Sequence, residues 1–114
     1  MSRKRSGAAR SLAATAPVFA ALGDETRLRV VSRLCESGPT SITKLTSGSN
    51  VTRQAIAKHL RVLEDAGLVR GAREGRESVW ELEPEALEDA RRCLDAISDQ
   101  WDEALGRLKA FVER

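Results

Sequence analysis

Residues 52–67, TRQAIAKHLRVLEDAG, decide the fold that this chain is expected to adopt. Thr52 is a favourable N-cap residue and Gly67 a favourable C-terminal stop, so the residues between them are predicted to form one helix. The apolar residues that fall on one side of this helix are Ile56, Leu60 and Leu63. An apolar side of this kind seats a helix on a folded domain.

The opposite side of the same helix carries long hydrogen-bond donors. Gln54 suits adenine and Arg61 suits guanine, each with about 1–3 kcal/mol of discrimination. The N-cap and the free backbone N–H groups beside it suit a phosphate. For His59 we expect packing and backbone contact in preference to base reading. The residues of this helix predicted to contact DNA are Thr52, Arg53, Gln54, Ala57, Lys58, His59 and Arg61.

An ordinary solvated amphipathic helix would show the same two sides, so the neighbouring elements decide between the two interpretations. The stretch 47–50, SGSN, is typical of a turn, and a short helix opened by Thr40 or Ser41 comes before it. Two helices joined by a short turn match a helix-turn-helix unit. Beyond the second helix, segments 69–74 and 77–82 predict a β-hairpin.

The hairpin carries Arg70, Arg73 and, at its tip, Arg76. A basic hairpin after a helix-turn-helix can lie along the DNA backbone or enter the minor groove, so all three arginines are expected phosphate contacts, with Arg73 and Arg76 as the predicted site residues. Arginines on a hairpin often serve only solubility. Their position after this helix favours phosphate contact.

The remaining helices complete the predicted fold. One begins at Thr15 or Ala16 with Pro17 in its first position, one follows an Asp24 N-cap, and a long one runs from Pro84 almost to the C-terminus. The prediction is a mainly α fold with a small β-hairpin wing, a winged helix-turn-helix in the order α-α-α-α-β-β-α. Residues 1–13 are predicted to be a basic, disordered arm, and 14–114 the domain with its C-terminal dimerisation helix.

Composition and charge agree with one small DNA-binding domain. The 114 residues are 41 % hydrophobic and carry a net charge of +2. Residues 1–80 hold 14 Lys/Arg against 7 Asp/Glu, and residues 81–114 hold 5 against 10, so the front is +7 and the rear −5. Only the front is therefore expected to face a polyanion. No apolar run reaches transmembrane length, and we expect a cytoplasmic protein.

Four separated motifs resemble the arsenic-repressor (ArsR) family of winged-helix regulators. They are FAALGDETRL at 19–28, TRQAIAKHL at 52–60, LEDAGLV at 63–69 and REGR at 73–76. The resemblance covers about residues 17–83. It implies a homodimer that binds a palindromic operator and usually represses transcription, often at its own promoter.

The long last helix carries a near-heptad apolar stripe with charged residues on its other face. So small a domain cannot cover a helix of this length, so part of the stripe is expected to meet a second subunit. The resemblance implies that the first and last helices form the dimer. The residues predicted at that interface are Val18, Phe19, Leu22, Leu94, Ile97, Trp101, Leu105 and Leu108.

The sequence offers few ligands for a metal effector. The segment 40–46 lacks Cys and His, residues 84–114 lack His, and the single histidine, His59, is on the helix predicted to face DNA. A transition-metal site needs three or four such ligands, so we expect no metal site and no cofactor. A redox switch through Cys35 and Cys93 and an unidentified small ligand stay open as alternatives.

The sequence also bears on two other classes of function. An enzyme is not expected, because the chain has no phosphate-binding glycine loop and no nucleophile motif. A winged-helix module that contacts only protein is the alternative to a DNA-binding repressor. The convergence of basic residues on one face favours DNA.

Overall fold

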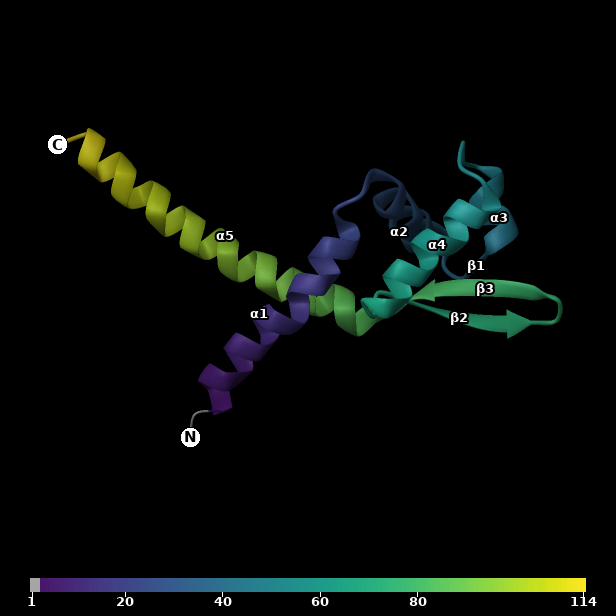
Figure 1. Ribbon diagram of the computed structural model, residues 1–114. Coiled ribbons are helices and arrows are strands. Elements are labelled where there is room, and N and C mark those ends of the chain that lie inside the picture. Colours follow the sequence, from purple (N-terminus) through teal and green to yellow (C-terminus); the bar gives the residue numbers. More distant parts are fainter. Residues whose placement is uncertain (1–2) are drawn as a thin grey trace.

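The computed structural model describes residues 3–114, and side chains from Leu12 onward. Its helices are α1 (Arg3–Leu22), α2 (Glu25–Ser37), α3 (Ile42–Ser47), α4 (Arg53–Asp65) and α5 (Pro84–Val112). Its strands are β1 (Thr40–Ser41), β2 (Val69–Glu74) and β3 (Glu77–Leu82). The predicted mainly helical winged fold is confirmed, with the hairpin of β2 and β3 projecting from the α2–α4 helices (Figure 1).

The predicted helix starts agree with the capping hydrogen bonds. Asp24 accepts from the backbone N–H of Arg27 at 3.0 Å, at the start of α2. Thr52 does the same for the N–H of Ala55 at 3.1 Å, at the start of α4. Each cap satisfies one of the backbone N–H groups that a helix N-terminus leaves without a partner.

The end of α4 shows why Gly67 stops it. The backbone N–H of Gly67 donates to the carbonyl of Glu64, and that of Leu68 donates to Leu63, both at 2.9 Å. This paired pattern requires a left-handed residue, and Gly67 adopts a φ of 80°. The chain therefore turns at once from α4 into β2, which keeps the wing beside the helix.

The first helix is longer than the sequence predicts. It begins at Arg3 instead of at Thr15 or Ala16, and Pro17 lies inside it. Alanine has the highest helix propensity, and the alanine-rich residues before Pro17 extend the helix toward the N-terminus. The predicted boundary of this helix is therefore wrong. Met1 and Ser2 lie outside the described residues, and the arm over 1–13 stays a prediction as a functional unit.

A third strand was not predicted. The two residues of β1 pair antiparallel with β3, Thr40 opposite Trp80 and Ser41 opposite Val79, which makes the sheet order β1-β3-β2. Two residues are too few to show the alternation that identifies a strand. This pairing ties the segment before α3 to the wing.

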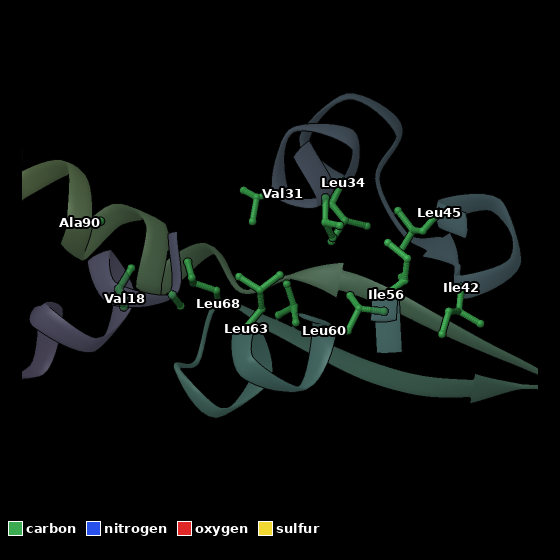
Figure 2. Packing of buried hydrophobic residues seen from close by; sticks show 13 residues of the cluster. Val18, Val31, Leu34, Ile42, Leu45, Ile56, Leu60, Leu63, Leu68 and Ala90 are labelled. Carbon is green, nitrogen blue, oxygen red and sulfur yellow. The ribbon is translucent and has the colours of Figure 1, made fainter. Parts of the chain in front are cut away.

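The core lies where the helices α1 to α4 and the base of the hairpin meet (Figure 2). Leu60, Leu63 and Leu68 are completely buried there. Each fully buried leucine contributes about 1.5–3 kcal/mol. The start of α5 joins this core through Ala90, whereas the rest of that helix extends away from the other elements (Figure 1). The core therefore fixes α4 and the wing and leaves most of α5 outside.

Candidate nucleic-acid interface

Helix α4 has the two sides that its sequence predicts. Ile56, Leu60 and Leu63 are at most 1 % exposed, so one side is completely used in the core. The other side is open to solvent, and the predicted contact residues exposed on or just before the helix are Thr52, Arg53, Gln54, Lys58 and Arg61. Ala57 and His59 are half-buried at the edges. The structure therefore presents one continuous polar side on α4.

The cations of this side differ in what they contact. Arg53 donates from Nη1 to the hydroxyl of Thr43 on α3 at 3.2 Å, which links the two helices of the helix-turn-helix. Lys58 and Arg61 form no ion pair with a carboxylate within residues 12–114. Both charges are therefore free to meet an anionic partner, without first breaking a contact inside the chain.

The wing carries two arginines that form no ion pair with a described carboxylate and one that does. Arg73 lies opposite Ser78 in the hairpin and Arg76 lies in its turn; both are exposed and form no ion pair with any described side chain. Arg70, by contrast, has Nε at 2.7 Å from a carboxylate oxygen of Glu81 and 3.4 Å from one of Glu83. These contacts raise the pKa of Arg70, first through the hydrogen bond to Glu81. Only Arg73 and Arg76 keep an uncompensated charge.

The hairpin is held by close packing at its centre. Trp80 of β3 lies opposite Gly71 of β2, and a Cβ atom on residue 71 would stand 3.0 Å from the indole ring. Glycine leaves the space that this ring occupies. With β1 on its other edge, β3 lies between two partners, so the wing arginines extend from a braced strand pair.

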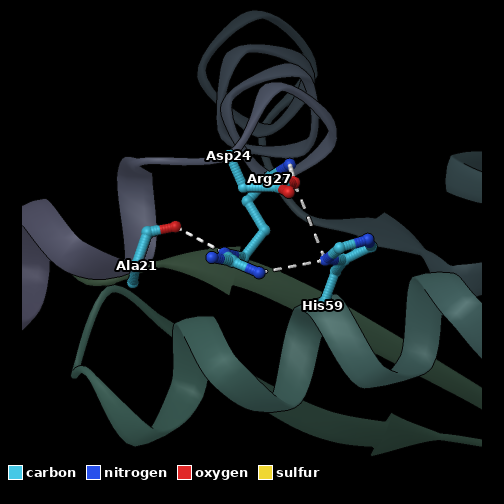
Figure 3. Close-up of polar contacts among 4 residues, drawn as sticks. All are labelled: Ala21, Asp24, Arg27 and His59. Atoms are coloured by element: carbon cyan, nitrogen blue, oxygen red, sulfur yellow. Dashed lines mark hydrogen bonds and ion pairs between the residues drawn. The ribbon is translucent and has the colours of Figure 1, made fainter.

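His59 points toward the start of α2, where Arg27 links it to the end of α1 (Figure 3). Its Nδ1 atom lies 3.3 Å from Nη1 of Arg27, and 3.9 Å from a carboxylate oxygen of Asp24. Arg27 also donates from Nε to the backbone carbonyl of Ala21, at the end of α1, at 2.5 Å. This geometry agrees with the packing role expected for His59, and its contact with DNA stays a prediction.

The parts played by Asp24 and Arg27 in this network were missed by sequence reasoning. The backbone N–H of Arg27 lowers the pKa of Asp24, and the charges of Arg27 and His59 act in the same direction. A cap residue is visible in a sequence, and Asp24 was predicted as one. Its proximity to a histidine 35 positions away, like that of Arg27 at 32 positions, depends on how α2 packs on α4. No local pattern indicates such a contact.

The predicted dimer residues fall into two groups. Leu94, Ile97, Trp101, Leu105 and Leu108 are 47–64 % exposed on α5. Val18 is only 4 % exposed and belongs to the chain's own core, and Phe19 and Leu22 are half-buried against that core. The α5 residues therefore form an open apolar face, here called the α5 stripe. Val18 has almost no surface left for a partner, and the interface itself stays a prediction.

The remaining predictions concern cysteines, metals and membranes. Cys35 is exposed and Cys93 is half-buried; both are free thiols, and their redox role stays a prediction. Among the described residues no group of three or more His, Cys, Asp or Glu side chains is arranged to hold a metal ion. No helix in that part of the chain has an apolar stretch long enough to cross a lipid bilayer.

Comparisons with known proteins point to one group of regulators. A family model described as a helix-turn-helix domain matches residues 22–72, from the end of α1 into β2. The HTH-type transcriptional regulator Rv2034 of Mycobacterium tuberculosis is 38 % identical over 93 residues, covering 82 % of this chain and 83 % of the relative. The arsenical resistance operon repressor of Bacillus subtilis is 36 % identical over 69 residues, covering 60 % of this chain and 66 % of the relative.

A solved structure extends the similarity to the whole fold. The ArsR-like transcriptional regulator from Rhodococcus sp. RHA1 is 38 % identical and superposes with a TM-score of 0.71. The match covers 88 % of this chain and 93 % of that structure. Similarity over this length includes the helix-turn-helix and the wing, and it agrees with the element order described above.

Proposed function

This chain belongs to the ArsR family of winged-helix, DNA-binding transcriptional regulators, and from that premise we propose that it is a homodimeric repressor. The dimer binds palindromic operators, and one of these lies in the protein's own promoter. Helix α4 enters the major groove and the wing lies along the backbone beside it. No enzymatic step is part of this function.

The observation that carries the proposal is the division of α4 into a buried and a free side. Gln54, Lys58 and Arg61 are exposed, while the apolar residues between them are fixed in the core. A helix held this rigidly presents its donors to base edges at little cost in conformational entropy. Arg73 and Arg76 on the wing add two uncompensated charges for phosphate contact.

The proposed dimer depends on the α5 stripe. A contiguous apolar surface that stays exposed on a small domain is typical of an association site. Most oligomers of soluble proteins are two-fold dimers, and a two-fold axis suits a palindromic site. Two α4 helices related in this way would read half-sites about 34–36 Å apart.

We propose regulation without a tightly bound transition metal. Helix α3, where relatives that sense metals commonly have thiolates, has the sequence ITKLTS and offers no soft ligand. The histidine of α4 is engaged with Arg27 and Asp24. Neither helix therefore supplies the ligand set that such a metal needs.

Operator binding is tested by fluorescence anisotropy with the protein's own upstream DNA and a scrambled duplex, at two salt concentrations. We expect saturable binding at least about 10³-fold tighter on the native duplex, with affinity falling as salt rises. Lys58→Ala combined with Arg61→Ala should weaken binding and reduce the salt slope by about two for each subunit, or about four for the dimer. The matched control is Arg91→Ala with Arg92→Ala, which removes two exposed arginines from α5.

The proposal would be contradicted if both duplexes bound equally and weakly, and if Lys58→Ala with Arg61→Ala did not change that binding. That outcome would favour a winged-helix module that contacts protein instead of DNA.

A further inference from the structure

A cavity of about 310 Å³ lies between α2 and the turn that joins α3 to α4. The α2 residues Arg29, Val30 and Arg33 form one side of the cavity, and residues 48–51 of the turn form its rim. Ile56 of α4 also lines the cavity. The volume is at the lower end of the range for small-molecule sites, about 300–1,000 Å³.

The charges around this cavity are of one sign. Two arginines line it and no carboxylate does. Arg29 is neutralised in part by Glu25, with Nη2 and Oε2 2.7 Å apart. Arg33 is half-buried, donates from Nη1 to the backbone carbonyl of Leu45 at 3.1 Å, and forms no ion pair among residues 12–114. The guanidinium of Arg33 therefore keeps an uncompensated charge at the cavity.

The rest of the lining is divided between apolar and hydroxyl or amide groups. Val51 is half-buried and supplies apolar surface, with Val30 and Ile56 almost completely buried behind it, whereas Ser49 and Asn50 supply polar groups at the rim. An apolar surface with one cation and a few polar groups is the pattern of a site that orients a small amphipathic anion. Purely inorganic anions would leave the apolar part uncovered.

We propose that this cavity binds a small organic carboxylate with an apolar body, such as an aromatic acid. The carboxylate pairs with Arg33, and the apolar body lies against Val51, in front of the buried Val30 and Ile56. The same turn carries Thr52, the cap of α4, at its end, so a ligand in the cavity contacts the segment that orients the DNA-reading helix. Through that contact the ligand changes operator affinity; this regulatory part rests on the proposed function above.

Gly48 gives a way to disturb the cavity without removing its charge. Its φ of −97° suits any residue, but a Cβ atom there would stand 2.7 Å from Nη1 of Arg33. Gly48→Ala should therefore displace the guanidinium while leaving the turn intact. Arg33→Gln removes the charge, and Arg33→Lys retains it but lacks the planar guanidinium that can donate two hydrogen bonds to one carboxylate.

The first experiment measures ligand binding without DNA, by ¹⁵N NMR titration of the full chain with benzoate and with benzamide, its neutral counterpart. We expect saturable benzoate shifts at the amides of Ser49, Asn50 and Val51, at least tenfold weaker binding of benzamide, and loss of the benzoate shifts in Arg33→Gln. Arg33→Lys should bind more weakly than wild type but more tightly than Arg33→Gln, and Gly48→Ala should weaken binding several-fold. Arg91→Gln, which removes an exposed α5 charge, is the matched control.

Several results of this titration would overturn the site. Equal shifts with benzoate and benzamide would remove the role of charge, and so would shifts that persist in a folded Arg33→Gln protein. Shifts spread over α4 and the wing would indicate general anion binding. Absence of saturable benzoate shifts in the wild-type chain would overturn the proposal outright.

The second experiment measures operator affinity with and without saturating benzoate. We expect a change of at least about fivefold in wild type and none in Arg33→Gln. No change in wild type would overturn the regulatory part. If Arg33→Gln alone reduced the salt slope by about one for each subunit, the cavity would hold a DNA phosphate instead of a free carboxylate. A chain that binds benzoate but no operator would overturn the proposed function and leave the site standing.

Discussion

Helices α4 and α5 have similar amphipathic patterns and very different surroundings. On α4 the residues Ile56, Leu60 and Leu63 are completely covered by the chain's own core, whereas Trp101 on α5 is 64 % exposed and its apolar neighbours are about half exposed. The first helix is fixed by the core and offers its polar side; the second extends from the core and offers its apolar side (Figure 1). Periodicity therefore identifies a helix face, while packing decides whether that face contributes to stability or to association.

The largest expected effect on stability comes from the buried side of α4. Leu60→Ala should lower the free energy of unfolding by about 2–5 kcal/mol, because it leaves a cavity at a completely buried position. The matched change on the α5 stripe is Leu108→Ala. Urea unfolding at two protein concentrations measures both. The Leu60 effect should not depend on concentration, whereas the Leu108 effect should shrink on dilution; identical behaviour of the two would remove the distinction between the helices.

Trp101→Ala tests the open side directly. A large aromatic residue at the centre of an interface contributes about 2 kcal/mol or more, so the dimer dissociation constant should rise at least 30-fold. Analytical ultracentrifugation measures it, and Asp102→Ala, an exposed neighbour on the same helix, is the control. An unchanged dimer in the Trp101 variant would place the interface elsewhere.

Gly71→Ala concerns the packing that braces the wing. The added Cβ must displace the Trp80 indole, and overpacking of this kind costs about 1–3 kcal/mol. Gly106→Ala on α5 is the counterpart, because a Cβ there meets no atom within 4 Å and should stabilise the exposed helix by about 0.5–1 kcal/mol. Thermal unfolding measures both. Opposite signs are expected, and a destabilising Gly106→Ala would indicate that this part of α5 is covered.

A smaller effect is expected from pH through Asp24. The N–H of Arg27 and nearby positive charge lower its pKa below the ordinary value of 3.8. A lowered folded-state pKa means that Asp24 stabilises the fold above the ordinary pKa and loses this contribution as the pH falls through the lowered one. Urea unfolding between pH 5 and 2 should show less acid sensitivity in Asp24→Asn than in wild type. Parallel curves would assign the acid sensitivity to other carboxylates.

Much of the fold could be predicted because its signals are local. The caps at Asp24 and Thr52, the stop at Gly67 and the hairpin around Gly75 are each encoded within a few residues. The start of α1 and the strand β1 could not be predicted in the same way. The first depends on how far an alanine-rich segment continues a helix past Pro17, and the second on pairing with a strand almost 40 positions later.

In the candidate site, too, the features encoded locally could be predicted and those that depend on packing between elements could not. The exposed donors of α4 follow from helical geometry and the buried leucines, so their positions were predicted. The contacts of Arg27 and Asp24 with His59, the pairing of Arg70 with Glu81, and the cavity beside Arg33 follow from packing between elements. The wing shows this most clearly, because the sequence does not indicate that Arg70, unlike Arg73 and Arg76, is paired with the carboxylates of Glu81 and Glu83.

Gln54→Ala tests whether α4 reads the bases of the operator directly. Gln54 is exposed and uncharged, so its loss should leave the salt dependence of binding unchanged. The measurement is the ratio of affinities for the native and scrambled duplexes at one salt concentration. We predict that this ratio falls by about 5- to 150-fold, the equivalent of 1–3 kcal/mol of base discrimination. An unchanged ratio would contradict the claim that this side of α4 reads the bases.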